Sequence, residues 1–435
     1  MEKITFVINT TKKEIKYLDL LLKSLDRNLS TNAHEIVVFV DTGFNDEVNQ
    51  VLEKWKPKFL DFSVIWNPLD IPIGYQRNIN ILVETAKHDI VSYLQSDMYI
   101  SKDYDIEILK QLHPGVMITA TRIEPPLHPA SPDKFVKDFG LTPDEFRERE
   151  FEEFCKSVYD DGKITNYYFA PFTFYKDDWI SIGGHDTIFR RSSEDVDIFN
   201  RLVLNGMVLK QIWSAYVYHF TCVSSRGKDW WKAENKVKTM LQEKAQQIEM
   251  RRFIYKWGAY RPIGSSELLP LYKYNVSATI KNPLINGNLL YNILPFFHSI
   301  YVDNEDIKIQ IITLIRNIEE PNGDVFIPGG MLTRIEWEAK YKKYVRTLNW
   351  NNIIQVGENT NEIIVEFDLS KLSNHYQVKC IQKINDSIHY STEEDSEYEY
   401  EIFRIKVKSK INKIMDNVIV KNPPLDFKLK KEKIV

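Results

Sequence analysis

The segment Ser193-Glu194-Asp195-Val196-Asp197 places three carboxylates within four positions at the start of a predicted helix. The pair Gly183-Gly184 lies before it and predicts a tight turn, because glycine adopts positive φ without steric cost. Apolar side chains follow at helical spacing and predict a buried face: Val196, Phe199, Leu202 and Val203. One ionised carboxylate in such a segment can accept a proton from a hydroxyl group. The structural alternative is that acidic side chains in a first turn only complement the helix dipole.

Polar residues also follow three short apolar runs that are typical of buried strands. Asn9-Thr10 comes after Ile4 to Ile8, Asp41 comes after Ile36 to Val40, and Gln95-Ser96-Asp97 comes after Ile90 to Leu94. Helical patterns separate these runs, and alternating strands and helices predict right-handed crossovers in a mostly parallel sheet. In such sheets ligands bind outside the carboxyl ends of the strands. We therefore expect Thr10, Asp41 and Asp97 to line one crevice.

Asp97 and His219 are the candidate ligands of a divalent cation. Mg²⁺ or Mn²⁺ typically combines a few protein oxygens with substrate phosphates, and His219, at the end of another predicted strand, could add an imidazole nitrogen. A lone histidine on an apolar strand is more often a core residue, which is the alternative. Arg77, Arg226 and Lys228 flank these segments and could neutralise phosphate oxygens, although solvated surface positions explain them equally well.

Bulk composition describes an ordinary globular protein of two domains, with 435 residues, 43% hydrophobic and 27% charged. A net charge of -4 gives no support to a nucleic-acid acceptor or partner. The three cysteines are widely spread, form neither a zinc spacing nor a disulfide framework, and fit a reducing compartment. We find no signal-peptide pattern and no run of about 18 apolar residues, so we expect no membrane span and a cytoplasmic location.

The local composition changes near residue 260, where Pro, Asn and Gly residues separate short β-like runs. These runs are Val276 to Ile280, Ile307 to Ile315, Ile353 to Val356 and Glu362 to Phe367. One helix is expected around Thr333 to Leu348. The pattern predicts a β-rich sandwich or small sheet. We expect a first domain over 1–258, a linker or subdomain over 259–300, and a β-rich C-terminal domain of unknown role over 301–435.

Taken together, these features describe a nucleotide-diphosphate site with a metal and a nearby carboxylate base. The first 257 residues or so resemble a family 2 glycosyltransferase with the GT-A fold, a Rossmann-like α/β fold with a mostly parallel mixed sheet. The matching features, in order and approximate spacing, are Ile4 to Asn9, Val40-Asp41-Thr42-Gly43, Arg77-Asn78, Gln95-Ser96-Asp97, Gly183-Gly184 with Ser193-Glu194-Asp195, and His219. The resemblance implies transfer of a hexosyl or pentosyl group from a nucleotide sugar, foremost a UDP-sugar, to a hydroxyl of a glycan or another small or polymeric acceptor.

The resemblance also implies roles for individual residues. Thr10 and Asp41 contact the nucleoside, and Arg77 lies near the donor diphosphate, where Arg226 could also bind. Asp97 is the metal-binding member of the Asp-x-Asp motif. In the Glu-Asp motif, Asp195 is the general base toward the acceptor hydroxyl and Glu194 orients bound groups. The family inverts the anomeric centre by a single displacement.

One position departs from the family pattern, because Gln95 replaces the first Asp of Asp-x-Asp. A carboxamide can hydrogen-bond a ribose but is a poor metal ligand, so metal dependence rests on Asp97 and His219. A nucleotidyltransferase is the nearest rival, but it would show a Gly-rich loop after the first strand, and Asn9 to Lys13 contains no glycine. A catalytically inactive sugar- or partner-binding protein is the other rival, against which the intact Glu194-Asp195 pair weighs. From position alone, we assign Glu124 to Pro132 and Tyr167 to Phe174 to the acceptor side.

Overall fold

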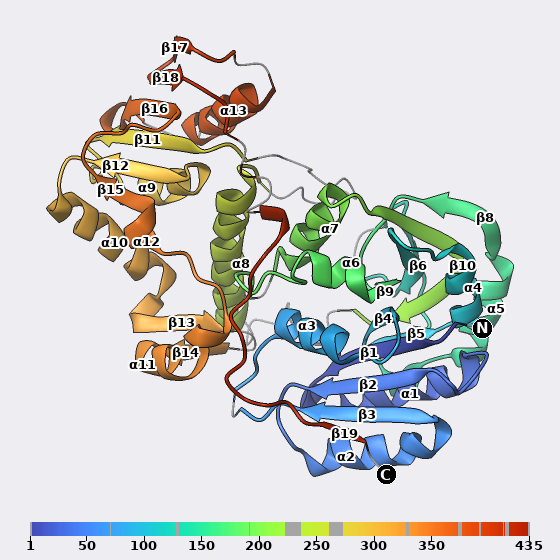
Figure 1. The fold of residues 1–435 in the computed structure, drawn as a ribbon. Coiled ribbons are helices and arrows are strands. Elements are labelled where there is room, and N and C mark those ends of the chain that lie inside the picture. Colours follow the sequence, from blue (N-terminus) through green and yellow to red (C-terminus); the bar gives the residue numbers. More distant parts are fainter. Residues whose placement is uncertain are drawn as a thin grey trace. The chain divides into compact units, whose positions relative to one another are not determined.

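The computed structural model describes residues 2–69, 71–127, 130–190, 192–221, 236–260, 273–327, 330–372, 376–390, 393–411, 413 and 417–433. They fall into two compact units (Figure 1). The first comprises Met1–His185, Leu202–Gln242 and Pro424–Val435, and the second comprises Asp186–Arg201 and Glu243–Pro423. Among the described residues, no helix has both the length and the apolar character that crossing a bilayer requires.

The first unit is built on one large sheet, whose described strands run in the order β19-β3-β2-β1-β4-β9-β6-β10-β5. Its central part is parallel. β1 (Ile4–Thr10) pairs with β2 (Glu35–Val40) on one side and with β4 (Ile90–Gln95) on the other, and β2 pairs with β3 (Asp61–Trp66). Every residue of β2 is buried, as expected for a strand that is covered on both faces. The predicted α/β class is confirmed.

Amphipathic helices connect the parallel strands: α1 (Ile15–Asn28), α2 (Asp46–Trp55) and α3 (Tyr75–Thr85). In α1, four buried leucines form a stripe at helical spacing: Leu18, Leu21, Leu22 and Leu25. Asn45 caps α2, because its Oδ1 accepts a hydrogen bond from the backbone N–H of Val48 at 3.0 Å. These local signals agree with the burial pattern, which explains why this region could be predicted.

The other half of this sheet is mixed. β9 (Phe172–Tyr175) lies antiparallel between β4 and β6 (Val116–Glu124), and β10 (Val208–His219) runs parallel to β6 and antiparallel to β5 (Met98–Ile100). The aromatic run Tyr167 to Phe174 contributes Phe172 and Phe174 to the core. The remaining elements of this unit are α4 (Tyr104–Gln111), β7 (Lys134–Val136), α5 (Glu148–Ser157), β8 (Asp160–Thr165), α6 (Lys176–Ser181) and β19 (Lys431–Lys433). Two helices contain residues of both units: α7 (Glu194–Leu204) and α8 (Lys236–Trp257).

The second unit has its own sheet, in the order β15-β12-β11-β16-β18-β17 among the described strands. The first four are parallel, and the last two are antiparallel. They are β15 (Ile354–Val356), β12 (Ser299–Val302), β11 (Val276–Lys281), β16 (Ile363–Asp368), β18 (Phe403–Val407) and β17 (Ser396–Tyr400). The other elements are α9 (Gly287–Ile293), α10 (Glu305–Glu319), β13 (Asp324–Ile327), β14 (Gly330–Thr333), α11 (Arg334–Glu336), α12 (Trp350–Ile353) and α13 (Tyr376–Tyr390).

One β-like run of the sequence was interpreted wrongly, since Ile307 to Ile315 lies within helix α10. The alternation of isoleucine with polar residues at its start also fits a strand. A strand would bury Ile309 together with Ile311, yet Ile309 is 58% exposed and Ile311 is buried. The helix begins at a local signal, because Asn304 Oδ1 accepts a hydrogen bond from the backbone N–H of Ile307 at 3.0 Å. The predicted strands near 276–280, 353–356 and 362–367 are confirmed as β11, β15 and β16.

The two units divide the chain at other places than the predicted boundaries of 258 and 300. β11 enters the sheet of the second unit at Val276, well before residue 301. Near the C-terminus, β19 pairs antiparallel with β3, so the last segment of the chain belongs to the first unit. Lys431 fixes this strand through an ion pair with the buried carboxylate of Glu35, at 2.5 Å.

The expected helix around Thr333 to Leu348 consists of α11 and short helical turns that end at Tyr344.

Candidate functional site

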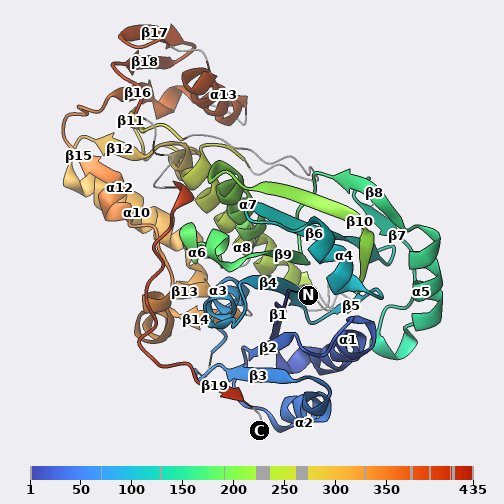
Figure 2. The same cartoon turned by 45° about the vertical axis from the view of Figure 1, so that its right-hand side comes forward.

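Three strand ends of the first unit bring Asp97, Glu124 and His219 together. β10 lies between β6 and β5 in the sheet (Figure 2). His219 lies opposite Met98 in the β10–β5 pair, and Tyr218 lies opposite Ile123 in the β10–β6 pair. A backbone hydrogen bond from Phe220 N–H to the carbonyl oxygen of Asp97, at 3.0 Å, continues the pairing past β5. The registers therefore place Asp97 and Glu124 on either side of His219. The structure confirms that Asp97 and His219 are neighbours.

The imidazole of His219 is oriented by Glu124. Nδ1 of His219 lies 2.9 Å from Oε1 of Glu124, and Nε2 lies 3.6 Å from Oδ1 of Asp97. Burial raises the pKa of Glu124, but the hydrogen bond with His219 and the charges of Arg122 and Lys134 outweigh it and hold that pKa well below its ordinary value. Glu124 is thus an ionised acceptor for an N–H at Nδ1. In the neutral tautomer that this bond favours, Nε2 presents its lone pair toward Asp97.

A second buried carboxylate, Glu14, stands near Asp97. It belongs to a capping box with Thr11, and its Oε2 accepts hydrogen bonds from the backbone N–H of Thr11 at 3.1 Å and from Ser96 Oγ at 3.0 Å. Burial and the negative charge of Asp97 raise the pKa of Glu14 to about 7, against the effect of these hydrogen bonds. Burial likewise raises the pKa of Asp97, with His219 opposing it. Repulsion between two buried carboxylates is relieved either by protonation of one of them, as the raised pKa values describe, or by a bound cation.

The residues present fit a divalent cation that the donor would help to ligate. Among the described residues, no group of three or more His, Cys, Asp or Glu side chains forms a metal site by itself. Two ligands at about 2.1 Å from one ion can lie up to about 4.2 Å apart, and the 3.6 Å between Asp97 Oδ1 and His219 Nε2 is within that reach. Magnesium-type ions commonly use one or two protein ligands and substrate phosphates for the remaining positions.

Asp41 holds the segment that leads into α3. Its Oδ1 accepts hydrogen bonds from Asn67 Nδ2 at 3.0 Å and from the backbone N–H of Ile73 at 2.9 Å, and its Oδ2 accepts one from the backbone N–H of Gly74 at 3.1 Å. Burial raises the pKa of Asp41 to about 6, although these hydrogen bonds and one from Asn78 oppose the shift. Asp41 therefore builds the loop beside the strand ends, and a contact between its side chain and a nucleoside remains a prediction.

The other predicted donor residues lie at the same edge of the sheet. Thr10 is completely buried at the end of β1, and its carbonyl oxygen accepts a hydrogen bond from the backbone N–H of Asp41 at 3.0 Å. Gln95 ends β4 opposite Asn9 and is partly exposed. Arg77 is buried in the first turn of α3. Arg226, together with Lys228 and His128, lies outside the described residues.

The three carboxylates of α7 have different environments within the second unit. Asp197 is completely buried, and it accepts from Arg201 Nε at 2.9 Å, from Trp257 Nε1 at 2.9 Å and from Lys256 Nζ at 2.7 Å. Its role is structural. Glu194 is also buried, whereas Asp195 is partly exposed. Asp195 is the most accessible carboxylate of the three.

The predicted tight turn before α7 is confirmed, since φ is +77° at Gly183 and +64° at Gly184. A Cβ at residue 184 would lie 2.3 Å from Asn80 Oδ1 and 2.6 Å from Trp179 Nε1. That oxygen accepts hydrogen bonds from the backbone N–H of His185 at 2.8 Å and from Trp179 Nε1 at 3.2 Å. Glycine is therefore required both by conformation and by the close approach of Asn80.

Two residues of the site were not identified as such from the sequence. Glu124 was assigned to the acceptor side as the first residue of a proline-rich loop, but it is the last residue of β6 and is buried against His219. Glu14 was not among the candidate residues. For Glu14, the capping-box spacing from Thr11 was a readable signal, but it gives no hint of Asp97. For Glu124, the signal is the register between β6 and β10, which a single sequence does not show.

Comparison with known proteins identifies a family over part of the chain. Residues 6–127 match the model of glycosyl transferase family 2, which confirms the predicted resemblance over that region. Asp97 and Glu124 lie inside the matched residues, and His219 and Asp195 lie outside them. No curated protein matches the sequence.

Several solved structures are similar at low identity. GalNAc-T7 with UDP, GalNAc and Mn²⁺ has 13% identity and a TM-score of 0.40, over 57% of this chain and 51% of that one. TarS 1-349 of S. aureus with UDP-GlcNAc has 14% identity and a TM-score of 0.36, over 58% and 72%. The mannosyltransferase PcManGT of Pyrobaculum calidifontis with GDP-Man and Mn²⁺ has 14% identity and a TM-score of 0.38, over 57% and 64%. The chain thus spans about half the length of the GalNAc-T7 structure, and likenesses at these TM-scores carry no argument about function.

Proposed function

Since residues 6–127 match glycosyl transferase family 2, we propose that the protein transfers a hexosyl or pentosyl group from a nucleotide-diphosphate sugar to a hydroxyl acceptor. The observation that carries the proposal is the pair of Asp97 and His219, with Nε2 of the imidazole 3.6 Å from the carboxylate and Glu124 behind it. This is a two-ligand arrangement beside the carboxyl ends of β1 and β4, where open α/β sheets bind ligands.

In this proposal Asp97 and His219 hold Mn²⁺ or Mg²⁺, and Glu124 keeps the imidazole in the tautomer that a metal ligand needs. The bound cation offsets the negative charge that develops on the leaving nucleoside diphosphate. Gln95, which replaces the first Asp of the family motif, supplies a carboxamide to the donor ribose instead of a metal ligand. Such a division of roles leaves one carboxylate and one imidazole for the cation, with donor phosphates as the other ligands.

The donor side of the proposal uses the neighbouring strand ends. Asp41 fixes the loop that precedes α3 through its hydrogen bonds with Ile73 and Gly74, and the nucleoside binds beside it. Thr10 ends the adjacent strand, and Arg77 and Arg226 provide cationic groups for the diphosphate. The donor that we propose first is a UDP-sugar, and the acceptor is a hydroxyl of a glycan or another small or polymeric molecule.

Asp195 is the proposed general base that deprotonates the acceptor hydroxyl, in a single displacement that inverts the anomeric centre. What supports this choice is the contrast within α7: Asp197 is taken up by Arg201, Lys256 and Trp257, whereas Asp195 is partly exposed. Glu194 would orient bound groups.

We place the enzyme in the cytoplasm, because Cys155 and Cys380, the cysteines that the structure describes, are free and buried.

A donor panel tests the proposal. The full chain would be incubated with UDP-, GDP- and other nucleotide sugars, with Mn²⁺, with Mg²⁺ or with a chelator, and release of nucleoside diphosphate would be measured. Metal-dependent turnover of one donor is the expected result. Binding of nucleotide sugars without turnover, also when candidate acceptors are added, would favour an inactive binding protein. Release of pyrophosphate from a nucleoside triphosphate and a sugar phosphate would favour a nucleotidyltransferase.

A further inference from the structure

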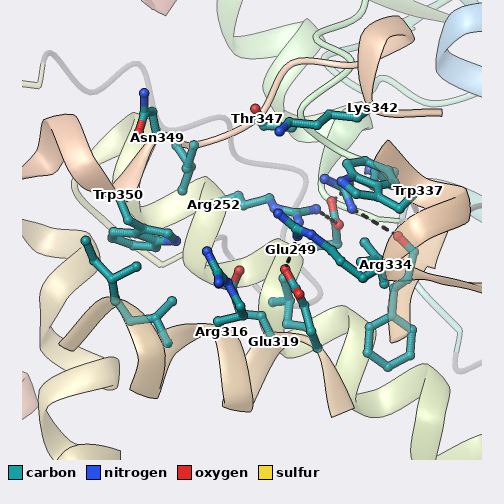
Figure 3. Close-up of a pocket in the computed structure, with 18 of the residues that line it drawn as sticks. Glu249, Arg252, Arg316, Glu319, Arg334, Trp337, Lys342, Thr347, Asn349 and Trp350 are labelled. Atoms are coloured by element: carbon teal, nitrogen blue, oxygen red, sulfur yellow. Dashed lines mark hydrogen bonds and ion pairs between the residues drawn. The ribbon is translucent and has the colours of Figure 1, made fainter. Parts of the chain in front are cut away.

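A cavity of about 400 Å³ lies within the second unit, among α8, α10, β13 and the segment from Arg334 to Asn351 (Figure 3). Its volume falls in the range of small-molecule sites. Its lining is rich in charge: five cationic side chains face it, against the three carboxylates of Glu249, Glu319 and Glu320. The cations are Arg190, Arg252, Arg316, Arg334 and Lys342. The cavity thus carries a surplus of positive charge.

Each carboxylate of the cavity has a hydrogen-bond or ion-pair partner, and Glu249 also accepts a hydrogen bond from the backbone N–H of Arg190 at 2.9 Å. Glu249 forms an ion pair with Arg252, and Glu320 forms one with Arg334. Glu319 accepts a hydrogen bond from the hydroxyl of Tyr291 at 3.1 Å. These pairs hold most of the charged lining in place. Among the described residues, the guanidinium groups of Arg190 and Arg316 form no ion pair, and the carboxylates of Glu249 and Glu320 act on them only at longer range.

Arg190 is a buried cation with unused hydrogen-bonding capacity. It is only 7% exposed, one Nη donates to the carbonyl oxygen of Phe326 at 3.0 Å, and its guanidinium lies 4.1 Å from the ring of Trp337. Its Nε has no hydrogen-bond partner in the described part of the chain. Burial and the nearby charge of Arg252 lower the pKa of Arg190 to about 9. An anionic ligand would satisfy this group, since leaving a buried charged donor unpaired is unfavourable.

Arg316 and Trp350 complete the cavity on its accessible side. Arg316 is exposed on α10, and within the described residues its guanidinium forms no ion pair or hydrogen bond, although its charge lowers the pKa of Glu320 and of Glu338. Figure 3 shows Arg252 and Arg316 between Trp350 on one side of the pocket and Trp337 on the other. Trp337 is buried and covered by Arg190, so it offers no free face, whereas Trp350 is partly exposed. The exposed part of the Trp350 indole suits a ring with an apolar side.

We propose that this cavity binds an anionic carbohydrate, a sugar ring that carries a phosphate or a carboxylate group. Arg190 and Arg316 bind the anionic group, as guanidinium forks do with phosphates and carboxylates. The ring stacks on Trp350, and the exposed Thr347 and Asn349 at the rim hydrogen-bond its hydroxyls. The hydroxyls of a sugar suit the exposed polar side chains of Thr347 and Asn349, and we therefore propose a sugar rather than a nucleobase. This site is separate from the proposed transfer reaction and does not depend on it.

Calorimetric titration of the full chain tests the proposal with five probes: glucose 6-phosphate, glucuronic acid, glucose, inorganic phosphate and adenosine monophosphate. We expect one or both sugar anions to bind at least ten-fold tighter than glucose and than phosphate, and the tighter of the two identifies the anionic group. The substitution Arg316→Gln should raise the Kd about ten-fold, in line with loss of a charge-assisted hydrogen bond. Trp350→Leu should weaken the sugar anions and leave phosphate unchanged.

Arg404→Gln is the matched control, because Arg404 is an exposed arginine of β18 that pairs with Glu397 outside the cavity. It should leave every Kd unchanged. Both Arg316 and Arg404 are exposed, so neither change should prevent folding, and thermal unfolding would verify this. The proposal is overturned if neither sugar anion binds, if phosphate binds as tightly as the sugar anions, if adenosine monophosphate binds more tightly than both, or if Arg316→Gln has no effect.

Discussion

Nε2 of His219 lies 3.6 Å from Oδ1 of Asp97, which is too long for a hydrogen bond and within the reach of two ligands of one cation. The other imidazole nitrogen is held by Glu124 at 2.9 Å. In the proposed cation site Glu124 would therefore be a positioning residue, acting on the cation only through the tautomer and the orientation of His219.

Glu124→Gln should therefore weaken cation binding without removing a ligand. We expect the Kd for Mn²⁺, measured by electron paramagnetic resonance in the presence of UDP, to rise about 10- to 100-fold. Glu153→Gln is the control, since Glu153 is an exposed carboxylate of α5 that pairs with Arg149. Equal Mn²⁺ affinity in the two variants would show that Glu124 does not position a metal ligand.

Substitutions of Asp195 and Asp197 should have different effects: the first should lower turnover, and the second should lower the free energy of unfolding. Asp197→Asn weakens buried ion pairs with Arg201 and Lys256, so urea unfolding should show a loss of about 3 kcal/mol. Asp195→Asn removes a partly exposed carboxylate and should change stability by less than about 0.5 kcal/mol, while turnover falls at least about 100-fold. If Asp195→Asn retained full turnover, Asp195 would not be the base.

Gly184→Ala should destabilise the first unit. Residue 184 has φ of +64°, and an added Cβ would meet Asn80 Oδ1 at 2.3 Å, an atom that already accepts two hydrogen bonds. Overpacking and backbone strain together should lower the free energy of unfolding by about 2 to 3 kcal/mol. The control is Gly206→Ala, where φ is also positive, at +93°, but no atom lies within 4 Å of the added Cβ. A similar loss in both variants would mean that only the backbone conformation matters.

Lys273 should make the stability of the second unit depend on pH. Burial, and then the charge of Lys413, lower the pKa of Lys273 to about 7; its Nζ lies 4.1 Å from the ring of Tyr255. In the unfolded chain this lysine keeps a pKa near 10.4, so between pH 7 and pH 10 the unfolded state binds more protons and stability rises with pH. From pH 7 to pH 9 the gain should be about 2 kcal/mol. Lys273→Met should abolish this contribution, whereas the exposed Lys281→Met should retain it; a pH slope that is unchanged in Lys273→Met would contradict the assignment.

The sequence could predict the parallel half of the first sheet because each element there carries its own local signal. The fully buried run from Glu35 to Val40 indicates a strand, and the leucine stripe of α1 indicates a helix packed on the sheet. The polar residue after each strand then marks the edge of the sheet where the strands end. Asp97 and Asp41 were found in this way. The turn at Gly183-Gly184 was readable for the same reason, since its signal lies in the residues themselves.

Long-range pairing explains what could not be predicted. Glu124 meets His219, 95 positions further along the chain, only because β6 and β10 pair with a register shift between Ile212 and Tyr216, and no local pattern fixes that pairing. The role of Asp197 depends in the same way on Lys256 and Trp257 in a distant helix. In the second unit, the start of α10 satisfies both a strand and a helix pattern, and tertiary packing of Ile311 and Ile315 decides between them.

The most direct measurement is release of nucleoside diphosphate by the wild-type chain and by Asp97→Ala, each at a series of Mn²⁺ concentrations with the donor that the panel identifies. Glu153→Gln serves as the control. The account predicts metal-dependent release by wild type and by the control, and at least about 100-fold slower release by Asp97→Ala at every Mn²⁺ concentration. Release by Asp97→Ala at the wild-type rate, with the same Mn²⁺ dependence, would contradict the assignment of this carboxylate to the cation.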